Sequence, residues 1–149
     1  MQVGYEKTMT ALLPAMAGVN LIYGLGMLEL GVTFSFGQLV ADAEIARMVK
    51  RVVQGVEVSD ATLGVDVIKA VGPGKDFLTQ KHTMDYMRIE QSRAKVFDRR
   101  MRSGWEQQGS KDASITADEM AREILATHKP EPLEASVKNE IRRIVESAE

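Results

Sequence analysis

The sequence has no cysteine, which excludes disulfide bonds, thiolate nucleophiles and metal sites built from thiolates. Its two histidines, His82 and His128, lie far apart and match no metal-ligand spacing, so we expect no metal site. Aromatic residues make up only 5% of the chain, whereas the nine methionines and many alanines favour helices over sheets. The formal net charge of −2 gives no general attraction to nucleic acid or to anionic membranes, and we expect neither as a partner.

Charged side chains are almost missing from one part of the chain. The 34 residues from Thr8 to Ala41 contain a single charged residue, Glu29. A segment this poor in charge is expected to be surrounded by other protein. The highly charged remainder offers little apolar surface for this purpose, and Glu29 is expected to pair with a segment that this chain does not contain. The pattern indicates the buried end of a larger molecule.

The uncharged run from Thr8 to Leu28 has the length of a transmembrane helix. Proline and glycine divide it, however, into a helix and a short extended piece. The N-terminus also lacks the basic region and apolar core of a signal peptide. We therefore expect a cytoplasmic protein without a membrane span. The dividing residues are Pro14, Gly18, Asn20, Gly24 and Gly26.

The first 55 residues predict a helix, a strand and a long helix. Apolar residues at three- and four-residue spacing predict the first helix, Tyr5–Ala17. The continuous apolar run Val19–Tyr23 predicts the only strand, covered on both faces as in a parallel sheet. The long helix begins after Ser35 and ends at Gln54. Its charged residues, Asp42 and Glu44 among them, are predicted to lie mostly off its apolar face.

The remaining chain predicts several charged, amphipathic helices. Each begins at a capping residue or ends at glycine or proline. They are Asp60–Val71 capped by Ser59; Met84–Gln91 capped by Thr83; Val96–Gln108 with Phe97, Met101 and Trp105 in one stripe; a helix from Asp112 or Thr116 to about His128; and Leu133–Ala148 with Leu133, Val137, Ile141, Ile144 and Val145 buried. His82 is expected to form a hydrogen bond at a helix entry and not to act as a catalytic base.

This order of elements predicts a mainly α fold with a single short strand. The first helix, the strand and the long helix match the C-terminal βα unit of a TIM (β/α)8 barrel, with the later helices appended. One parallel strand cannot form a sheet, so its partners must come from elsewhere. We therefore expect a fragment of a larger α/β barrel, in which residues 1–55 form the closing portion and residues 56–149 a C-terminal helical extension.

Short motifs with glycine, proline and histidine recur along the chain. They are Gln2-x-Gly4-x-Glu6; Ala17-Gly18-Val19-Asn20-Leu21-Ile22-Tyr23-Gly24-x-Gly26-Met27-Leu28-Glu29; Gly72-Pro73-Gly74; Phe77-Leu78 with His82-Thr83; Trp105 followed by Gly109; and His128-x-Pro130-x-Pro132-Leu133. In this order and spacing they resemble the C-terminal third of the trimethylamine methyltransferase family. The resemblance spans essentially the whole chain.

The resemblance implies a (β/α)8-barrel enzyme that removes a methyl group from trimethylamine or a related quaternary amine such as glycine betaine. The implied acceptor is the reduced cobalt of a corrinoid (cobalamin) carried on a separate protein, so this chain binds no cofactor directly. Some family members place pyrrolysine in the barrel, at a position that would lie upstream of Met1. The resemblance assigns no catalytic residue to this chain.

Five residues are candidates for substrate binding at the mouth of such a barrel, where the strands end. Tyr23 can offer a π-face to a methylammonium group, and Gly24 follows it. Glu6 can balance a cationic substrate, with Gln2 nearby, and Asn20 lies partway along the strand. Structural roles compete in each case: a core tyrosine, a hydrogen-bonded asparagine, or a glutamate favoured by a helix dipole.

Two further interpretations concern partners. Residues 88–102 hold six basic residues against two acidic ones, which fits a solvated face, or a docking surface for an acidic corrinoid protein. The alternative function is a non-catalytic, small α-helical protein-interaction module that buries Thr8–Leu28 as a helical hairpin around Gly18. In the barrel interpretation the isolated chain leaves Thr8–Leu28 uncovered, so we expect it to form a homo-oligomer and to lack activity.

Overall fold

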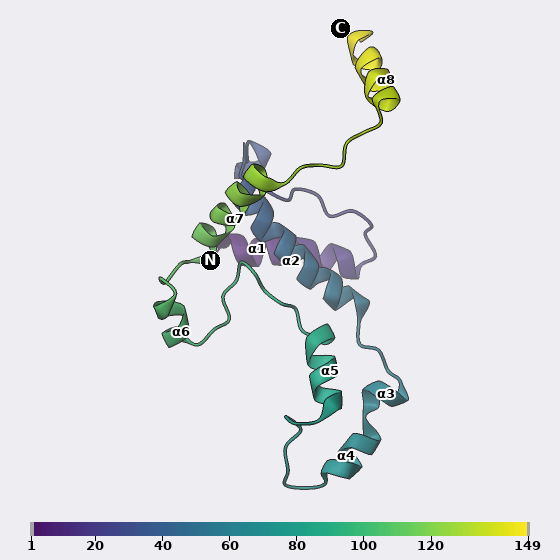
Figure 1. Ribbon diagram of the computed structural model, residues 1–149, viewed down its shortest axis with the longest axis vertical. Helices are drawn as coiled ribbons and strands as arrows, with labels where there is room; N and C mark the ends of the chain where they lie inside the picture. The colour runs from purple at the N-terminus through teal and green to yellow at the C-terminus, as the bar shows by residue number, and fades with distance from the viewer. Residues whose placement is uncertain (1, 149) are drawn as a thin grey trace.

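Three long helices form the centre of the computed structural model, which describes residues 2–148 (Figure 1). They are α1 (Gln2–Met16), α2 (Phe36–Gln54) and α7 (Ala113–Thr127). Helix α2 packs against both α1 and α7. Residues on both sides of position 55 therefore contribute to one body, and the division at this position stays a prediction.

The apolar core is small and lies mainly between α1 and α2. Ala11 on α1 packs with Ile45 and Val49 on α2. On α7 the buried side chains are the small ones of Ala117 and Ala121. The partly buried residues around the core are Leu12, Ala15, Ile22, Met48 and Phe97. Many larger apolar side chains stay at the surface, so apolar burial alone holds little of this chain together.

Helices α2 and α7 approach closely at Gly37, in the first turn of α2. A Cβ atom there would overlap the carboxylate of Asp118 on α7 and lie 3.3 Å from its backbone nitrogen. The predicted start of α2 is confirmed, because Ser35 Oγ accepts the N–H of Gln38 at 3.1 Å. The N-terminus of α2 is thus capped by Ser35, and the absence of a side chain at Gly37 allows α7 to pack closely against it.

The predicted strand Val19–Tyr23 is wrong, because these residues form an irregular connection after α1. A strand requires a neighbour for its backbone N–H and C=O groups, and residues 2–148 supply none beside this segment. Leu21 is 76% exposed and Tyr23 is 82% exposed, so the segment is not covered on two faces. The alternative hairpin around Gly18 is also wrong, since α1 ends at Met16 and no α-helix follows before α2.

The mainly α fold is confirmed, but the strands that form are two and lie elsewhere. Strands β1 (Met27–Leu28) and β2 (Thr33–Phe34) pair antiparallel around the 3₁₀ helix η1 (Glu29–Gly31). A pair this short forms no part of a parallel sheet, and membership in a TIM barrel stays a prediction. Among residues 2–148, no helix combines the length and apolarity needed to cross a membrane.

Four short helices follow α2. The predicted helix Asp60–Val71 is divided at Gly64, and Ser59 begins its first part through a capping box with Thr62. Thr83 lies inside a helix and not at its N-cap. The four are α3 (Asp60–Leu63), α4 (Val65–Val71), α5 (Lys81–Glu90) and α6 (Arg102–Gln107).

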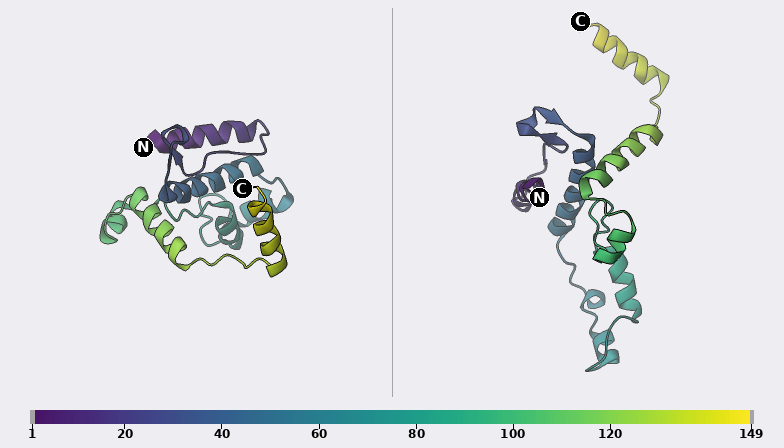
Figure 2. Two further views of the ribbon diagram at one scale, coloured as in Figure 1. Left: turned by 90° about the horizontal axis from the view of Figure 1, so that it is seen from above. Right: turned by 90° about the vertical axis from the view of Figure 1, so that its left-hand side faces the viewer.

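The last two helices differ in how far they pack. Helix α7 begins after Asp112, whose Oδ1 accepts the N–H groups of Ser114 and Ile115, so Asp112 and not Thr116 is the N-cap. Helix α8 (Ala135–Glu146) is shorter than predicted and projects away from the other helices (Figure 2). Its predicted burial is wrong, because the other described residues do not cover its apolar face. The exposed residues are Leu133, Val137, Ile141, Ile144 and Val145.

The carboxylate of Glu44 on α2 holds a distant loop against this helix. Its oxygens accept the backbone N–H groups of Lys95, Val96 and Phe97 at 2.7, 3.0 and 3.2 Å. Arg47 pairs with it at 3.2 Å. Glu44 is only 1% exposed, and this burial by itself would raise the pKa of its carboxyl group. The backbone donors and Arg47 outweigh burial, so that the pKa lies below its ordinary value of 4.5.

The predicted helix Val96–Gln108 is wrong over residues 96–101, since the helix in this region, α6, begins only at Arg102. Residues 95–97 instead form a loop whose backbone N–H groups donate to the Glu44 carboxylate. Phe97 packs against the core between α1 and α2 and lies before α6, so no single helix carries it in a stripe with Met101 and Trp105. The Trp105 indole instead donates to the carbonyl of Lys111 at 2.7 Å.

We predict that Glu44→Ala lowers the free energy of unfolding by at least about 2 kcal/mol. Three backbone donors lose their acceptor, and leaving one buried donor without a partner costs about 1–3 kcal/mol. Urea denaturation followed by circular dichroism measures the change. Glu57→Ala, at an exposed position, is the control and should stay within about 0.5 kcal/mol of the unmodified chain.

The stabilisation by Glu44 also has a predicted pH dependence. Its folded-state pKa lies below the unfolded value, so the contribution is fully present above about pH 4.5. It is lost as the pH falls through the folded-state pKa. Equal stability of Glu44→Ala and the unmodified chain at pH 7 would contradict the assignment.

Candidate functional site

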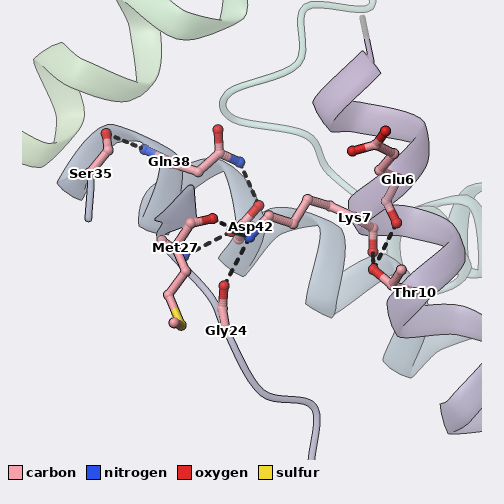
Figure 3. A network of polar contacts seen from close by, with 9 residues as sticks. Glu6, Lys7, Thr10, Gly24, Met27, Ser35, Gln38 and Asp42 are labelled. Carbon is pink, nitrogen blue, oxygen red and sulfur yellow. Dashed lines mark hydrogen bonds and ion pairs between the residues drawn. The ribbon is translucent and has the colours of Figure 1, made fainter. Parts of the chain in front are cut away.

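An ammonium–carboxylate pair joins α1 to α2 (Figure 3). Lys7 Nζ on α1 lies 3.1 Å from Oδ2 of Asp42 on α2, and Asp42 is 4% exposed. The same ammonium donates to the carbonyl oxygens of Gly24 and Met27, both at 2.8 Å. Gln38 Nε2 donates to Asp42 Oδ1 at 2.6 Å. We call this set of bonds the Lys7 network; it fixes the loop that follows Tyr23 against both helices.

Gly26 lies at the turn of this loop and joins the Lys7 network. Its N–H donates to Asp42 Oδ2 at 2.8 Å. Its φ of +79° is a conformation that glycine adopts without strain. A Cβ atom would also lie 3.0 Å from Cβ of Leu39 and 2.6 Å from the ring of Phe34. Glycine is therefore required at position 26, because the loop approaches α2 too closely there for a side chain.

A hollow of about 450 Å³ opens between α1 and residues 23–31. Three predicted substrate-binding residues line it: Glu6, Tyr23 and Gly24. The high exposure of the Tyr23 side chain leaves it accessible to a ligand. Gln2 and Asn20 do not line the hollow. Gln2 Nε2 donates to Glu6 Oε1 at 2.8 Å, which orients that carboxylate, whereas Asn20 lies at an exposed bend.

The charges around the hollow favour a cation. Glu6 and Glu29 line it, and neither forms an ion pair with another residue from 2 to 148. Lys7 also lines it, but its charge is balanced by Asp42. Two carboxylates without a countercharge make the local potential negative, which attracts ammonium groups and repels anions.

Glu29 also lines the hollow, although it is not among the predicted substrate-binding residues. Its φ of +51° and that of Leu30, +55°, are unusual for residues other than glycine. Thr33 Oγ1 donates to Glu29 Oε2 at 2.8 Å, which fixes the carboxylate at the edge of the hollow. The available signal was its status as the single charge in the run Thr8–Ala41. That signal suggested an ion pair with an absent segment and not a ligand contact.

A smaller cavity of about 210 Å³ lies beside the hollow, between α1 and α2. Tyr23, Gly24 and Lys7 line both spaces, so the loop after Tyr23 separates them. The walls of the smaller cavity are largely apolar, with Ala11, Leu21 and Ile45 among them. Two of the lining residues, Leu21 and Tyr23, are nevertheless largely exposed.

The His82 side chain makes a hydrogen bond to a backbone carbonyl. His82 Nε2 lies 2.7 Å from the carbonyl oxygen of Ala61, and its ring stacks on Tyr86 with 4.4 Å between centroids. This confirms the predicted hydrogen bond at a helix entry, since His82 lies in the first turn of α5, and its partner is a residue of α3. Within residues 2–148, no three histidine or acidic side chains gather as metal ligands would.

Similar proteins are named as methyltransferases of trimethylamine or of glycine betaine. The chain is 48% identical over 148 residues to trimethylamine methyltransferase MttB of Desulfitobacterium hafniense (strain DSM 10664 / DCB-2), which covers 99% of this chain and 30% of that protein. Trimethylamine methyltransferase MttB2 of Methanosarcina mazei is 47% identical over 151 residues, with the same coverage. Glycine betaine methyltransferase of Desulfitobacterium hafniense (strain Y51) is 31% identical over 137 residues, 91% of this chain and 28% of that protein.

The family model described as trimethylamine methyltransferase (MTTB) matches residues 1–148. The chain therefore belongs to the trimethylamine methyltransferase family, and the resemblance seen in its motifs is confirmed. It spans about 30% of the length of the relatives it matches. The five substrate-binding residues stay predictions, of which the structure brings Glu6, Tyr23 and Gly24 to one hollow.

We predict that Lys7→Met increases amide hydrogen exchange at Gly26 by at least about tenfold. The loop loses two hydrogen bonds from the ammonium, and Asp42 is left as a buried carboxylate without its cation. Hydrogen exchange followed by NMR measures the rate. Lys50→Met is the matched control, because Lys50 is exposed and forms no ion pair within residues 2–148. Equal exchange at Gly26 in both variants would show that the network does not hold the loop.

Proposed function

We propose that this chain is the C-terminal part of a methyltransferase that moves a methyl group from trimethylamine, or from a quaternary amine such as glycine betaine, to a corrinoid protein. The names of the relatives support the reaction class. Identity of 48% to a trimethylamine enzyme, against 31% to a glycine betaine enzyme, supports trimethylamine as the first substrate to test. The observation that carries the proposal is the hollow with two carboxylates and an exposed tyrosine ring.

In this proposal the side chains around the hollow bind and orient the amine. The Tyr23 ring lies against the methyl groups of the cationic amine, an arrangement worth about 0.5–2 kcal/mol. Glu6 and Glu29 balance the positive charge. The corrinoid of the partner protein supplies the cobalt nucleophile that accepts the methyl group. Catalysis then depends on alignment of the N–CH3 bond with the cobalt, so a fixed position of the loop after Tyr23 matters.

The activity belongs, in this proposal, to a larger assembly in the cytoplasm. The relatives contain 70% of sequence beyond the matched 30% (100 − 30). A barrel built from that sequence would cover the apolar face of α1 and complete the site around the hollow. We therefore propose that this chain alone does not transfer methyl groups.

A chimaera tests this function. In it, the present chain replaces the matching segment of the Desulfitobacterium hafniense trimethylamine methyltransferase MttB. We expect methyl transfer from trimethylamine to a corrinoid protein. Tyr23→Ala in the chimaera should raise the KM for trimethylamine about 2- to 30-fold, the loss of one cation–π contact. Tyr86→Ala, which removes a tyrosine stacked on His82 outside the hollow, should leave the KM unchanged.

Two results would count against the proposal. A folded but inactive chimaera would favour the alternative, a non-catalytic interaction module, for which the exposed apolar faces of α1 and α8 provide support. An active chimaera in which Tyr23→Ala leaves the KM for trimethylamine unchanged would remove Tyr23 from the binding site.

We further propose that the isolated chain forms a homo-oligomer through α1. Four large side chains make an exposed stripe along this helix: Tyr5, Met9, Leu13 and Met16. Met9→Glu with Leu13→Glu should shift the chain from oligomer to monomer in size-exclusion chromatography with light scattering. Leu78→Glu with Met101→Glu adds the same charge at exposed positions outside the stripe and should leave the oligomer intact. A monomeric unmodified chain at micromolar concentration would contradict this proposal.

A further inference from the structure

Positive charge is concentrated in residues 88–102, which we call the basic segment. It contains six basic and two acidic residues, a net charge of +4 (6 − 2). The whole chain has a net charge of −2, so the other residues together carry −6 (−2 − 4). The separation of charge along the chain is therefore much larger than the overall value suggests, and the basic segment is an attractive surface for anions.

The basic segment is held in a defined position although most of it has no regular secondary structure. The Glu44 carboxylate accepts three consecutive backbone N–H groups from it, as described above. Arg99 Nη1 also donates to the carbonyl oxygen of Ser92 at 3.0 Å, which closes the loop on itself. A loop fixed before binding loses less conformational entropy when a partner docks.

Apart from Arg99, which donates to the carbonyl oxygen of Ser92, three basic side chains of the segment have no acidic partner within residues 2–148: Arg88, Arg93 and Lys95. All three are exposed. Other basic residues of the segment are neutralised locally, since Arg100 pairs with Asp98 and Arg102 pairs with Glu106. The chain has 21 acidic residues, so the lack of partners at these three positions does not reflect a shortage of carboxylates.

The segment also encloses space for an incoming side chain. A hollow of about 610 Å³ is lined by residues 91–100 and Thr116 of α7. Its lining includes Arg93, Lys95 and Arg99. Guanidinium groups around such a hollow can bind a carboxylate through two parallel hydrogen bonds.

We propose that the basic segment is a docking surface for a carboxylate-rich patch on a partner protein. This inference rests on the proposed function in one respect: the proposed function identifies the partner as the protein that accepts the methyl group. The basic segment and the hollow near Tyr23 are different surfaces, one built on residues 88–102 and the other on α1 with residues 23–31. The partner would thus be held at a site separate from the one that binds the amine.

The distribution of charge favours a compact acidic protein over a nucleic acid. A nucleic acid is a long polyanion that would extend past the basic segment over surfaces with a net charge of −6. An acidic patch on a folded protein has limited extent and can be matched to the segment alone.

The experiment measures binding of a 20-residue glutamate-rich helical peptide to the full chain by fluorescence anisotropy. A triple variant, Arg88→Ser with Arg93→Ser and Lys95→Ser, removes the three side chains without breaking the backbone bonds to Glu44. The control, Lys129→Ser with Lys138→Ser and Arg142→Ser, removes the same charge from exposed positions that form no ion pair within residues 2–148. A single-stranded DNA of equal charge is the competing probe.

We expect the first triple variant to weaken peptide binding by at least about tenfold and the control by less than about twofold. Absence of peptide binding, equal weakening by both variants, or tighter binding of the DNA would each overturn the proposal. No methyl donor is present in this experiment. An inactive chimaera with intact peptide binding would therefore refute only the proposed function, and the reverse result would refute only the docking surface.

Discussion

Two buried carboxylates on α2 determine where the irregular parts of this chain lie. Asp42 accepts the Gly26 N–H and pairs with Lys7, which fixes the loop after Tyr23. Glu44 holds the loop at residues 95–97. Two residues that are two positions apart on an α-helix point in directions about 160° apart, so Asp42 and Glu44 serve different sides of α2. Because the apolar core is small, these polar anchors position both the candidate amine site and the basic segment.

Local signals in the sequence predict the starts of some helices but not these anchors. Ser35, Ser59 and Asp112 cap helices as their patterns indicate, because a cap acts within four residues of itself. Hydrophobic periodicity places Asp42 and Glu44 on a face away from the apolar one, because charged residues on an amphipathic helix are assigned to the solvent-exposed face. Their partners are backbone groups 16 and 51 to 53 residues away in the sequence. Helical periodicity relates residues only a few positions apart, so it cannot predict these contacts.

In the candidate site, too, some residues are predicted from local sequence motifs, whereas others depend on contacts between residues distant in the sequence. The family motif predicts five binding residues, and three of them come together because Lys7 holds the loop with Tyr23 and Gly24 against α1, which carries Glu6. The apolar run Val19–Tyr23 predicts a strand covered on both faces, but a strand needs a second backbone beside it, and the segment is largely exposed. Glu29 escapes prediction because its position at the hollow depends on two residues with positive φ.

The connection between α7 and α8 sets how α8 can meet any surface. Residues 128–134 contain Pro130 and Pro132, and proline-rich linkers are extended and semi-rigid, with about 3.1 Å per residue. The span is therefore roughly 20 Å, and a tether of this length confines a helix to a volume in which its effective concentration reaches the millimolar range. Even a weak affinity of α8 for a neighbouring surface would then suffice for high occupancy.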